Sequence, residues 1–598
     1  MPHTVTFVTA IMQIYDTPYD GRTTEWRLSK FRDIVETGIR LCVYASEALY
    51  EEVLNFAAPY ENIDVVKWRN VEETQVGQWT NDVEYTIPDA RNLAKDTAAY
   101  MMLINAKVEC VDEATRRNVW NTTHFAWIDF SVSYVFKEGQ KTLEYLKFIG
   151  QCAFQKEPFL AVAGCSEPVG DVGRILNGVV WRFCGGFLLG DAGSVQEMYR
   201  MYQTHFPVFM RTHRRLVWEV NFWAYLEAHT EWRPLWYKAD HDDSILRIPV
   251  HLYSTILDTH LLKTEYQYPP MEPFCPMQAS HVVFDGTHYL NTRCVNYRVI
   301  ENGAYDIRHP QGIIITQNVL SVLDVEADYA PKQFHKMREE ETVGLPLKHA
   351  WTQGLEDVRL YVVDGRVRFI ATNMNYSPTQ QNSMVVGDYD VESHGYANCR
   401  IVRSPQGDGR CEKNWIPVVH KGCCLPTPEE AGCCLPTPEK AGEELFIYRW
   451  SPMEIGRVAR NTLEDGRQED VLNIVQTYPV IAPNFDKVRG STTFVEGENN
   501  DLVGLVHFSE ELCPRRYYHM LVSLCKETLR PLKYSRVFGF QHLGIEFCTG
   551  FCIDKGGDGG GEGEPETKRK YRFWISKWDR EPKMVTIDAT RILLEYEF

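Results

Sequence analysis

Residues 125–131 read Phe-Ala-Trp-Ile-Asp-Phe-Ser, and this stretch decides the fold of the first half of the chain. Its first five residues form an apolar run that ends on a carboxylate, which predicts a buried strand with Asp129 at its carboxyl end. Ligands of α/β sheets bind beyond the carboxyl ends of the strands, so Asp129 is the strongest single candidate for a site residue. A turn aspartate or a helix N-cap is the alternative interpretation.

The flanking sequence alternates between strand-like and helix-like segments. The strand-like segments are short and rich in β-branched residues: Val5–Ile11, Leu41–Ala45 and Ile63–Trp68. The helix-like segments are Thr24–Gly38 and Ser46–Phe56, with Thr24 and Ser46 as expected caps, and Asp89–Asp112, the longest helical pattern. This β-α-β order predicts a mainly parallel sheet with helices on its faces.

The pattern changes at the proline-rich segment 269–276, where a linker is expected. Beyond it, short aromatic and β-branched runs are joined by Asp285-Gly286, Asn302-Gly303 and Asp364-Gly365, which are typical two-residue hairpin turns. Repeated hairpins predict a closed or radially repeated all-β architecture, and a five-bladed β-propeller would use about 65 residues per blade. We therefore expect an α/β domain over residues 1–270 and an all-β domain over 275–598.

The overall charge narrows the classes of partner. With 63 Lys+Arg against 81 Asp+Glu, the 598-residue chain carries a net charge of −18, which argues against a broad nucleic-acid binder and against an anionic membrane surface. No secretory signal and no transmembrane stretch are recognisable. Seventeen irregularly spaced cysteines favour reduced thiols in a cytoplasmic compartment, that of a host cell if the chain is viral.

Two low-complexity inserts interrupt the second half. GCCLPTPEEA at 422–431 recurs as GCCLPTPEKA at 432–441, placing four cysteines within twelve positions. A thiolate metal site is one interpretation, but adjacent cysteines chelate a single zinc poorly, so a duplicated surface loop is favoured. The glycine-rich run at 556–563 has the composition of a flexible linker.

Other polar groups of the first half are candidates for chemistry. Gly185 and Gly186 would let a ligand approach the backbone closely, although a structural turn explains them equally well. Glu219 opens a helical stretch and is a candidate base for an acceptor hydroxyl, with an exposed helix-start glutamate as the alternative. His241 and the carboxylates beside it could complete the shell of a divalent ion, or form a solvated loop.

Six segments carry a resemblance as a set: FVTA, KDTAAYMMLINAK, FAWIDF, FCGGFLLGD, WEVNFWAYL and WYKADHDDSIL. In this order, over about residues 4–250, they resemble the HtrL/YibB-type family of predicted glycosyltransferases. The resemblance implies a Rossmann-like (GT-A type) domain that uses a nucleotide-sugar donor and Mn²⁺ or Mg²⁺. It implies the following roles: Asp129 and His241 as metal ligands, Gly185 and Gly186 beside the sugar, Glu219 as base, and Thr9, Ala10 and Lys107 along the nucleotide. The acidic motif is usually Asp-x-Asp, whereas Ser131 takes the second place here.

The second half contains clusters of arginine, asparagine and histidine among aromatic residues. Glu356, Asp357 and Arg359 precede a hairpin, and the other clusters contain Arg293, Asn296, Arg298, Arg489, His507 and His519. Together they resemble the five-bladed propeller of mannoside phosphorylases and related mannosyltransferases, with Val358 in place of the proline of an E-D-P-R motif. The arginines could bind phosphate in a bidentate manner, Asp357 is the catalytic candidate, and structural ion pairs between blades are the alternative.

The sequence thus predicts a glycosyltransferase that moves a sugar from a nucleotide-sugar donor to a glycan or glycoprotein acceptor. A bifunctional protein of surface-glycan synthesis, with a second carbohydrate-active site in the propeller, is the setting that the resemblances imply. Two alternatives stay open: a non-catalytic glycan-binding or scaffold protein, and a glycoside phosphorylase or hydrolase that acts through the propeller.

Overall fold

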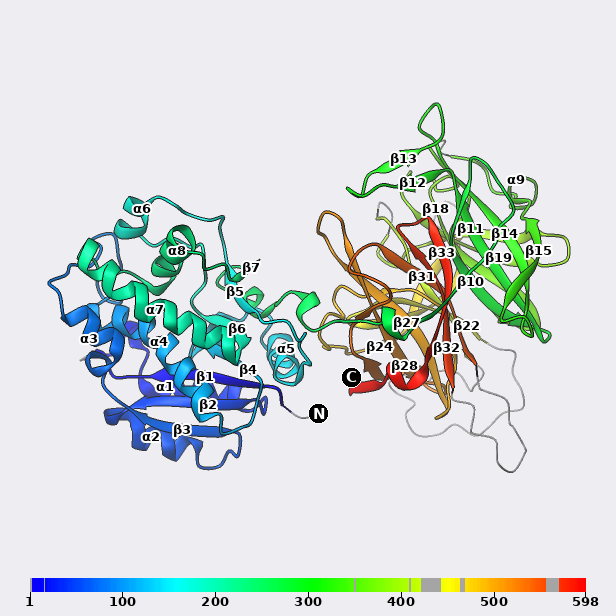
Figure 1. Ribbon diagram of the computed structural model, residues 1–598. Coiled ribbons are helices and arrows are strands. Elements are labelled where there is room, and N and C mark those ends of the chain that lie inside the picture. Colours follow the sequence, from blue (N-terminus) through cyan, green and yellow to red (C-terminus); the bar gives the residue numbers. More distant parts are fainter. Residues whose placement is uncertain are drawn as a thin grey trace, which may run out of the picture. The chain divides into compact units, whose positions relative to one another are not determined.

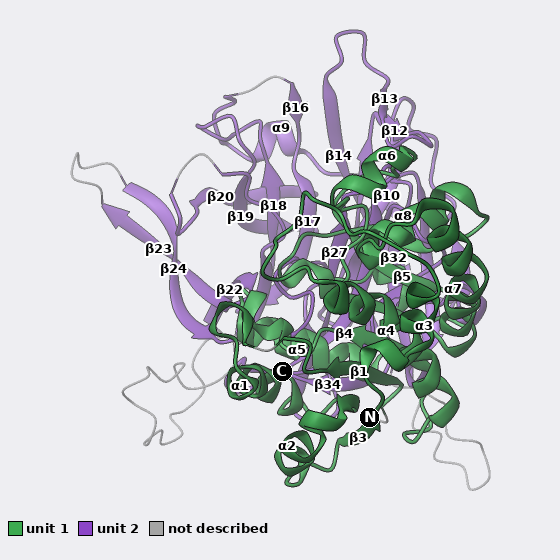
Figure 2. Ribbon diagram, turned by 90° about the vertical axis from the view of Figure 1, so that its left-hand side faces the viewer, with its two compact units in different colours: residues 1–253 green, residues 254–598 purple. Residues whose placement is uncertain are grey.

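The computed structural model describes residues 3–15, 17–348, 351–407, 410–420, 443–462, 468–554 and 569–598. The chain divides into two compact units, residues 1–253 (unit 1) and 254–598 (unit 2), coloured separately in Figure 2. The division precedes the proline-rich segment because the short strands at Thr255–Ile256 and Leu262–Glu265 pair with late strands of unit 2. The duplicated cysteine segment and the glycine-rich run lie outside the described residues.

Unit 1 contains a seven-stranded mixed sheet in the order β3-β2-β1-β4-β6-β5-β7 (Figure 1). Strand β6 runs antiparallel to both of its neighbours, and the other pairs are parallel. The bounds of these strands are β1 Val5–Ile11, β2 Arg40–Ser46, β3 Ile63–Trp68, β4 His124–Ile128, β5 Leu160–Gly164, β6 Phe187–Asp191 and β7 Leu235–Lys238. The predicted α/β class and mainly parallel sheet are therefore confirmed.

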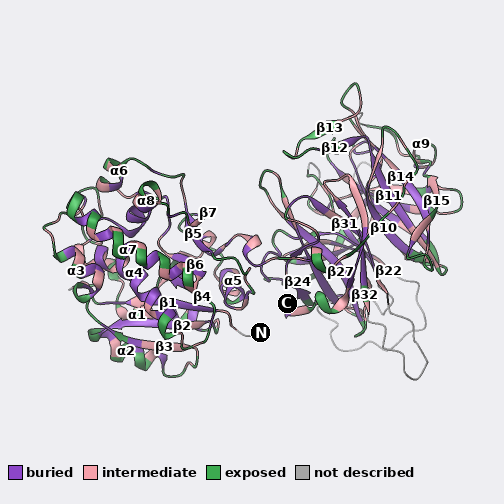
Figure 3. Cartoon of the chain, viewed as in Figure 1, coloured by how far each residue is buried: buried purple, intermediate pink, exposed green. Residues whose placement is uncertain are grey.

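Helices cover both faces of this sheet. Val8 of β1 belongs to an apolar cluster with side chains of α4, α7 and α8, whereas its neighbour Phe7 faces α5 at Gly150. Every residue of β4 is buried, as expected for a strand enclosed on both sides (Figure 3). The helices are α1 Thr24–Val35, α2 Glu47–Ala57, α3 Gln75–Asn81, α4 Ala98–Arg117, α5 Gly139–Gln151, α6 Val172–Asn177, α7 Ala192–His213 and α8 Glu219–His229.

Two predicted helix starts differ from the structure. The N-cap of α1 is Thr23, whose hydroxyl accepts a hydrogen bond from the Trp26 amide, so the prediction of Thr24 was wrong by one residue. Helix α4 begins only at Ala98 because residues 91–96 form a loop closed by the Asp96 side chain, which accepts a bond from the Asn92 amide. As a result α7, with 22 residues, is longer than α4, with 20.

Unit 2 consists of β-strands apart from single-turn helices among its described residues. Its pairings form five groups of four antiparallel strands, two of them joined into one eight-stranded sheet by β20 and β24. The groups are β10-β11-β14-β15, β17-β18-β19-β20, β21-β22-β23-β24, β27-β28-β29-β34 and β31-β32-β33-β9. The last group is completed by β9, from the beginning of the unit. The predicted all-β class is confirmed.

Two of the three predicted two-residue hairpin turns of unit 2 are confirmed, whereas Asn302-Gly303 lies inside the five-residue connection 300–304 between the paired strands Tyr297–Val299 and Tyr305–Ile307. Asp285-Gly286 joins β10 to β11 and Asp364-Gly365 joins β17 to β18, with positive φ at all four residues, as this turn type requires. The strands of unit 2 are β8 Thr255–Ile256, β9 Leu262–Glu265, β10 Cys275–Phe284, β11 Thr287–Val295, β12 Tyr297–Val299, β13 Tyr305–Ile307, β14 Ile314–Asp324, β15 Ala330–Lys336, β16 Thr352–Gln353, β17 Glu356–Val363, β18 Arg366–Asn373, β19 Ser383–Asp390, β20 Gly395–Arg403, β21 Ile416–His420, β22 Glu443–Trp450, β23 Met453–Thr462, β24 Gln468–Tyr478, β25 Arg489–Gly490, β26 Val495–Glu496, β27 Asp501–Glu510, β28 Arg516–Cys525, β29 Pro531–Ser535, β30 Phe538–Gly539, β31 Glu546–Asp554, β32 Lys570–Lys577, β33 Glu581–Asp588 and β34 Leu594–Glu597. Within the described part of the chain, no helix has the length and apolar character needed to cross a bilayer.

Candidate functional site

A cleft of about 800 Å³ lies at the carboxyl ends of β1 and β4 in unit 1. Ala10 near the end of β1 and Asp129 directly after β4 both line it, so the cleft occupies the position expected for a ligand of an α/β sheet. The candidates Lys107, Gly185, Gly186, Glu219 and His241 line the same cleft. The structure thus brings together residues that are up to 231 positions apart in the chain (241 − 10).

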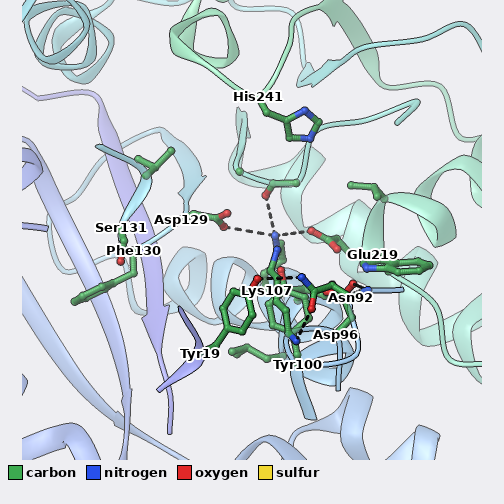
Figure 4. A pocket seen from close by; sticks show the side chains of 18 of the residues that line it. Tyr19, Asn92, Asp96, Tyr100, Lys107, Asp129, Phe130, Ser131, Glu219 and His241 are labelled. Atoms are coloured by element: carbon green, nitrogen blue, oxygen red, sulfur yellow. Dashed lines mark hydrogen bonds and ion pairs between the residues drawn. The ribbon is translucent and has the colours of Figure 1, made fainter. Parts of the chain in front are cut away.

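Lys107 is the central residue of one wall. Its side chain is 2 % exposed, and its ammonium group donates hydrogen bonds to the Gly185 carbonyl at 2.7 Å and to Glu219 Oε1 at 2.8 Å. It also lies 3.7 Å from Asp129 Oδ1 and 5.2 Å from the centre of the Trp127 ring. Figure 4 shows the ammonium group between the two carboxylates. We call Lys107, Asp129, Gly185 and Glu219 the lysine cluster.

The electrostatics of the lysine cluster favour its charged form. Burial lowers the pKa of Lys107, but the Glu219 and Asp129 carboxylates outweigh this effect, so the pKa lies above its ordinary value. Glu219 is itself buried, and the interpretation of an exposed helix-start glutamate therefore does not hold. Burial also raises the pKa of the nearby Tyr100 hydroxyl well above its ordinary value, assisted by the same two carboxylates.

Asp129 is fixed on one side and open on the other. Its backbone amide donates to the Gly186 carbonyl at 3.0 Å, and its Oδ1 accepts a 2.8 Å bond from Trp127 Nε1. The side chain is nevertheless 52 % exposed. The carboxylate is therefore held in one orientation while part of it remains accessible from the cleft.

The two glycines of the cleft have different surroundings. A Cβ atom at Gly185 would lie 1.9 Å from Glu219 Oε1 and 3.2 Å from Lys107 Nζ. At Gly186 the nearest atoms, Asp129 Oδ2 and Ile245 Cδ1, would be 3.6 Å away, which is ordinary contact. Close packing against Glu219 therefore requires glycine at position 185 but not at 186.

This difference gives a matched test. We expect Gly185→Ala to displace the Glu219 carboxylate and to lower both stability and any activity of the cleft, whereas Gly186→Ala leaves both near the wild-type value. Thermal unfolding of the two variants, measured side by side, checks the expectation. Equal melting temperatures for the two variants would contradict it.

The sequence analysis missed several cationic residues of the cleft, of which we call Arg22, Arg27 and Lys95 the cationic wall. Arg91 also lines the cleft, but its guanidinium group donates to two backbone carbonyls. The Arg22 guanidinium lies 4.5 Å from the centre of the Tyr134 ring, and Lys95 Nζ lies 5.0 Å from that of Tyr100. Arg27 forms no ion pair with any described carboxylate, and burial lowers its pKa. Arg22 precedes α1, Arg27 lies within it and Lys95 precedes α4, so no sequence motif connects them.

For two residues, the surroundings in the structure differ from the roles that the resemblance implies. Thr9 is fully buried in β1 and does not line the cleft, whereas the next residue, Ala10, does. His241 lies at the cleft with its ring edge-on to Trp181, and its Nδ1 is 3.3 Å from Asp240 Oδ1 and 3.8 Å from Cys165 Sγ. The polar contacts of His241 Nδ1 are therefore with Asp240 and Cys165, and not with Asp129.

In unit 2, the candidates Arg293, Glu356 and Asp357 lie together. Arg293 donates to Asp357 Oδ1 at 2.6 Å and to Glu356 Oε2 at 2.9 Å, and Gln278 donates to the same Asp357 oxygen at 2.6 Å. All three charged side chains are at most 13 % exposed. Burial raises the pKa of Asp357, but Arg293 and Arg359 outweigh it, so the pKa lies below its ordinary value.

The other candidates of unit 2 divide by burial. Arg359 is fully buried and donates to the backbone carbonyls of Asp357, Gly490 and Ser491, so its contacts are structural hydrogen bonds and not the ion pairs named as the alternative. Asn296 is also buried and joins the backbone at residues 313 and 315. The remaining candidates comprise two exposed arginines, Arg298 and Arg489, and two buried histidines, His507 and His519.

Asp579 is a further acid near this cluster that the sequence analysis missed. Burial raises the pKa of Asp579 to about 6; Arg293 lowers it and Asp357 raises it further. An unfolded aspartate titrates near ~3.9. Between about pH 4 and pH 6 the folded chain therefore holds a proton that the unfolded chain has lost, and this contribution to stability disappears as the pH rises.

We expect Asp579→Asn to stabilise unit 2 relative to the wild type more strongly at pH 7 than at pH 4.5. Asparagine cannot ionise, so the variant avoids the buried charge that the wild type acquires in this range. Chemical unfolding at both pH values measures the difference, and Asp364→Asn, in the β17–β18 turn, is the matched control. A difference that is independent of pH would contradict the assignment.

No protein-family model and no curated protein sequence match the chain, so the HtrL/YibB-type resemblance stays a prediction. Several solved structures are similar to it at low identity. A GDP-Man-dependent mannosyltransferase from Leishmania mexicana is 9 % identical over 55 % of this chain and 90 % of that chain, with a TM-score of 0.33. A mannose phosphorylase from the same organism is 9 % identical over 56 % and 92 %, with a TM-score of 0.30. Mouse xyloside xylosyltransferase 1 is 11 % identical over 40 % and 85 %, with a TM-score of 0.23.

Proposed function

We propose that unit 1 is a glycosyltransferase that moves a sugar from a nucleotide-sugar donor to a glycan acceptor. The observation that carries the proposal is the cleft itself, in which the accessible Asp129 and the buried Lys107–Glu219 pair share one space with the cationic wall. Few other ligand classes need a cationic wall, aromatic surfaces and a fixed carboxylate together.

The cationic wall supports the binding of a diphosphate. Arg22, Arg27 and Lys95 can each donate to phosphate oxygens, and the guanidinium groups can do so in a bidentate manner. The aromatic residues of the cleft supply flat surfaces for a base or a sugar ring: Tyr15, Tyr19, Trp26, Tyr100, Trp127, Phe130, Tyr134, Trp181 and Trp218. A nucleotide diphosphate sugar presents these groups in one molecule.

Asp129 is the residue that would hold a divalent ion. Mg²⁺ is usually held by one or two carboxylates together with substrate phosphates, and the single accessible carboxylate of Asp129 fits this pattern without a second aspartate at Ser131. When bound, Mn²⁺ or Mg²⁺ would neutralise charge on the departing diphosphate. The bond from Trp127 Nε1 keeps the carboxylate aimed during binding.

Glu219 is the proposed base for the acceptor hydroxyl. Lys107 holds Glu219 Oε1 from one side, and the glycine at position 185 leaves the space in which this contact forms. A carboxylate fixed in this way can accept the proton of a hydroxyl that approaches from the cleft.

For unit 2 we propose a five-bladed propeller that carries a second carbohydrate site. The five groups of four antiparallel strands, the last completed by β9, match one blade each. The buried acids Glu356 and Asp357, with Asp579 nearby, support a phosphorylase, hydrolase or transferase site in this unit. A purely glycan-binding unit is the competing function.

The test of the transferase is nucleotide release from a panel of nucleotide sugars, with Mn²⁺ or Mg²⁺ and with or without acceptor glycans. We expect release from one donor class, stimulated by an acceptor and suppressed by chelation of the metal. No release from any donor, combined with retained glycan binding, would replace the transferase with the scaffold alternative.

A further inference from the structure

A compact group of metal-binding side chains lies at the cleft beyond the lysine cluster. Cys165 follows β5, Cys184 precedes β6 and His241 comes shortly after β7, so three neighbouring strands of the sheet bring them to one edge. Backbone bonds fix this edge: the Cys184 amide donates to Ala163 at 2.7 Å, and the Cys165 amide donates to Trp181 at 3.1 Å. These bonds hold both cysteines beside the sheet, and the bond from the Ala239 amide to the Gly164 carbonyl at 2.8 Å holds the segment that leads to His241.

The distances within the group are those of a shared ligand shell. The two sulfurs are 3.4 Å apart, Cys165 Sγ lies 3.8 Å from His241 Nδ1, and the three ligand atoms all lie within 4.8 Å of one another. Two sulfurs at ~2.3 Å from one tetrahedral zinc are about 3.8 Å apart, so a few tenths of an ångström of movement would complete the geometry.

We propose that Cys165, Cys184 and His241 bind one Zn²⁺ ion at the edge of the cleft. Two thiolates and an imidazole are soft and intermediate ligands that suit zinc and disfavour Mg²⁺ or Mn²⁺, which prefer oxygen. Asp240 Oδ1, 3.9 Å from Cys165 Sγ and 3.3 Å from His241 Nδ1, is the nearest carboxylate for the fourth position. This zinc site is separate from the divalent ion proposed at Asp129. In this proposal His241 binds the same zinc ion as the two cysteine thiolates and does not bind the ion at Asp129.

The zinc ion would fix the positions of the His241 and Trp181 side chains at the cleft. Cys184 and His241 line the cleft, and the His241 ring packs edge-on against Trp181 with 4.2 Å between ring centres. Fixing the imidazole to the sheet through zinc would hold the partly exposed Trp181 indole at the cleft, in a position suited to stack on a sugar. Figure 4 shows His241 beyond the lysine cluster at this side of the cleft.

The experiment measures zinc in the full-length protein purified under reducing conditions, by elemental analysis and native mass spectrometry. We expect one zinc ion per chain, lost in Cys165→Ser and in Cys184→Ser and retained in Cys513→Ser, an exposed cysteine of unit 2. Replacing zinc with Co²⁺ should give a thiolate-to-cobalt absorption band in the wild type that is absent from the Cys165 variant.

The four cysteines of the duplicated segment are a separate possible source of zinc, so a further variant removes them. With Cys423, Cys424, Cys433 and Cys434 all changed to serine, we expect one zinc ion per chain to remain. Zinc that disappears in this variant but persists in Cys165→Ser would overturn the proposal, and so would a wild-type protein without zinc or with Cys165 and Cys184 joined as a disulfide. None of these measurements depends on transferase activity, so the zinc site and the proposed function fail independently.

Discussion

Replacing Asp129 with asparagine will lower the rate of nucleotide release by roughly 10²–10³-fold, the usual effect of losing one electrostatic contact to a developing charge. The substitution keeps an oxygen that can accept the Trp127 bond, so the position of the side chain is preserved. It removes the negative charge that would hold a divalent ion against the diphosphate. The effect should therefore appear as a loss of metal-dependent turnover, with the melting temperature nearly unchanged.

The matched control for this variant is Asp82→Asn, which makes the same chemical change at an exposed residue that does not line the cleft. Initial rates should be measured over a series of Mn²⁺ concentrations for the wild type and both variants. If Asp129→Asn retains release within twofold of the wild type at every concentration, then Asp129 does not serve the donor, and the cationic wall alone would have to bind it.

The position of the candidate site in the fold was predictable because it depends on a local rule. The apolar run of β4 identifies a buried strand, and the residue that follows it must emerge at the carboxyl edge of the sheet, which places Asp129 correctly. The same logic explains the correct hairpins of unit 2, since Asp285-Gly286 and Asp364-Gly365 specify their own turns. In these cases, the residues that specify the local structure are neighbours in the sequence.

The remaining features depend on contacts between distant residues or on small shifts along an element. Thr9 and Ala10 are adjacent in β1, and alternation along the strand buries the first while the second lines the cleft. Arg22 and Arg27 belong to the cleft only because α1 and the segment before it lie beside it. The thiol pair at 165 and 184 joins a histidine 57 positions further on, a spacing that no short zinc motif contains.

The second large effect concerns stability, and it follows from the burial of the Lys107–Glu219 pair. Both side chains are at most 7 % exposed, and their charged atoms are 2.8 Å apart. In Lys107→Met the Glu219 carboxylate loses its partner while it stays buried, so we expect a loss of about 3–5 kcal/mol in the free energy of unfolding. Lys67→Met is the matched control, because Lys67 and Glu47 form an ion pair of 2.7 Å that is more than half exposed. We expect little change there, since water replaces the lost partner.

A double variant separates charge from packing in the same experiment. Lys107→Met together with Glu219→Gln removes both charges, so the penalty of an unpaired buried carboxylate disappears, and the double variant should be more stable than Lys107→Met alone. Urea unfolding of the wild type, both single variants and the double variant gives the coupling energy directly. If Lys107→Met and the double variant unfold at the same urea concentration, then Lys107 stabilises unit 1 through its packing and its bond to the Gly185 carbonyl, and its charge does not hold Glu219 in place. In that case the proposed base would need a different partner to orient it.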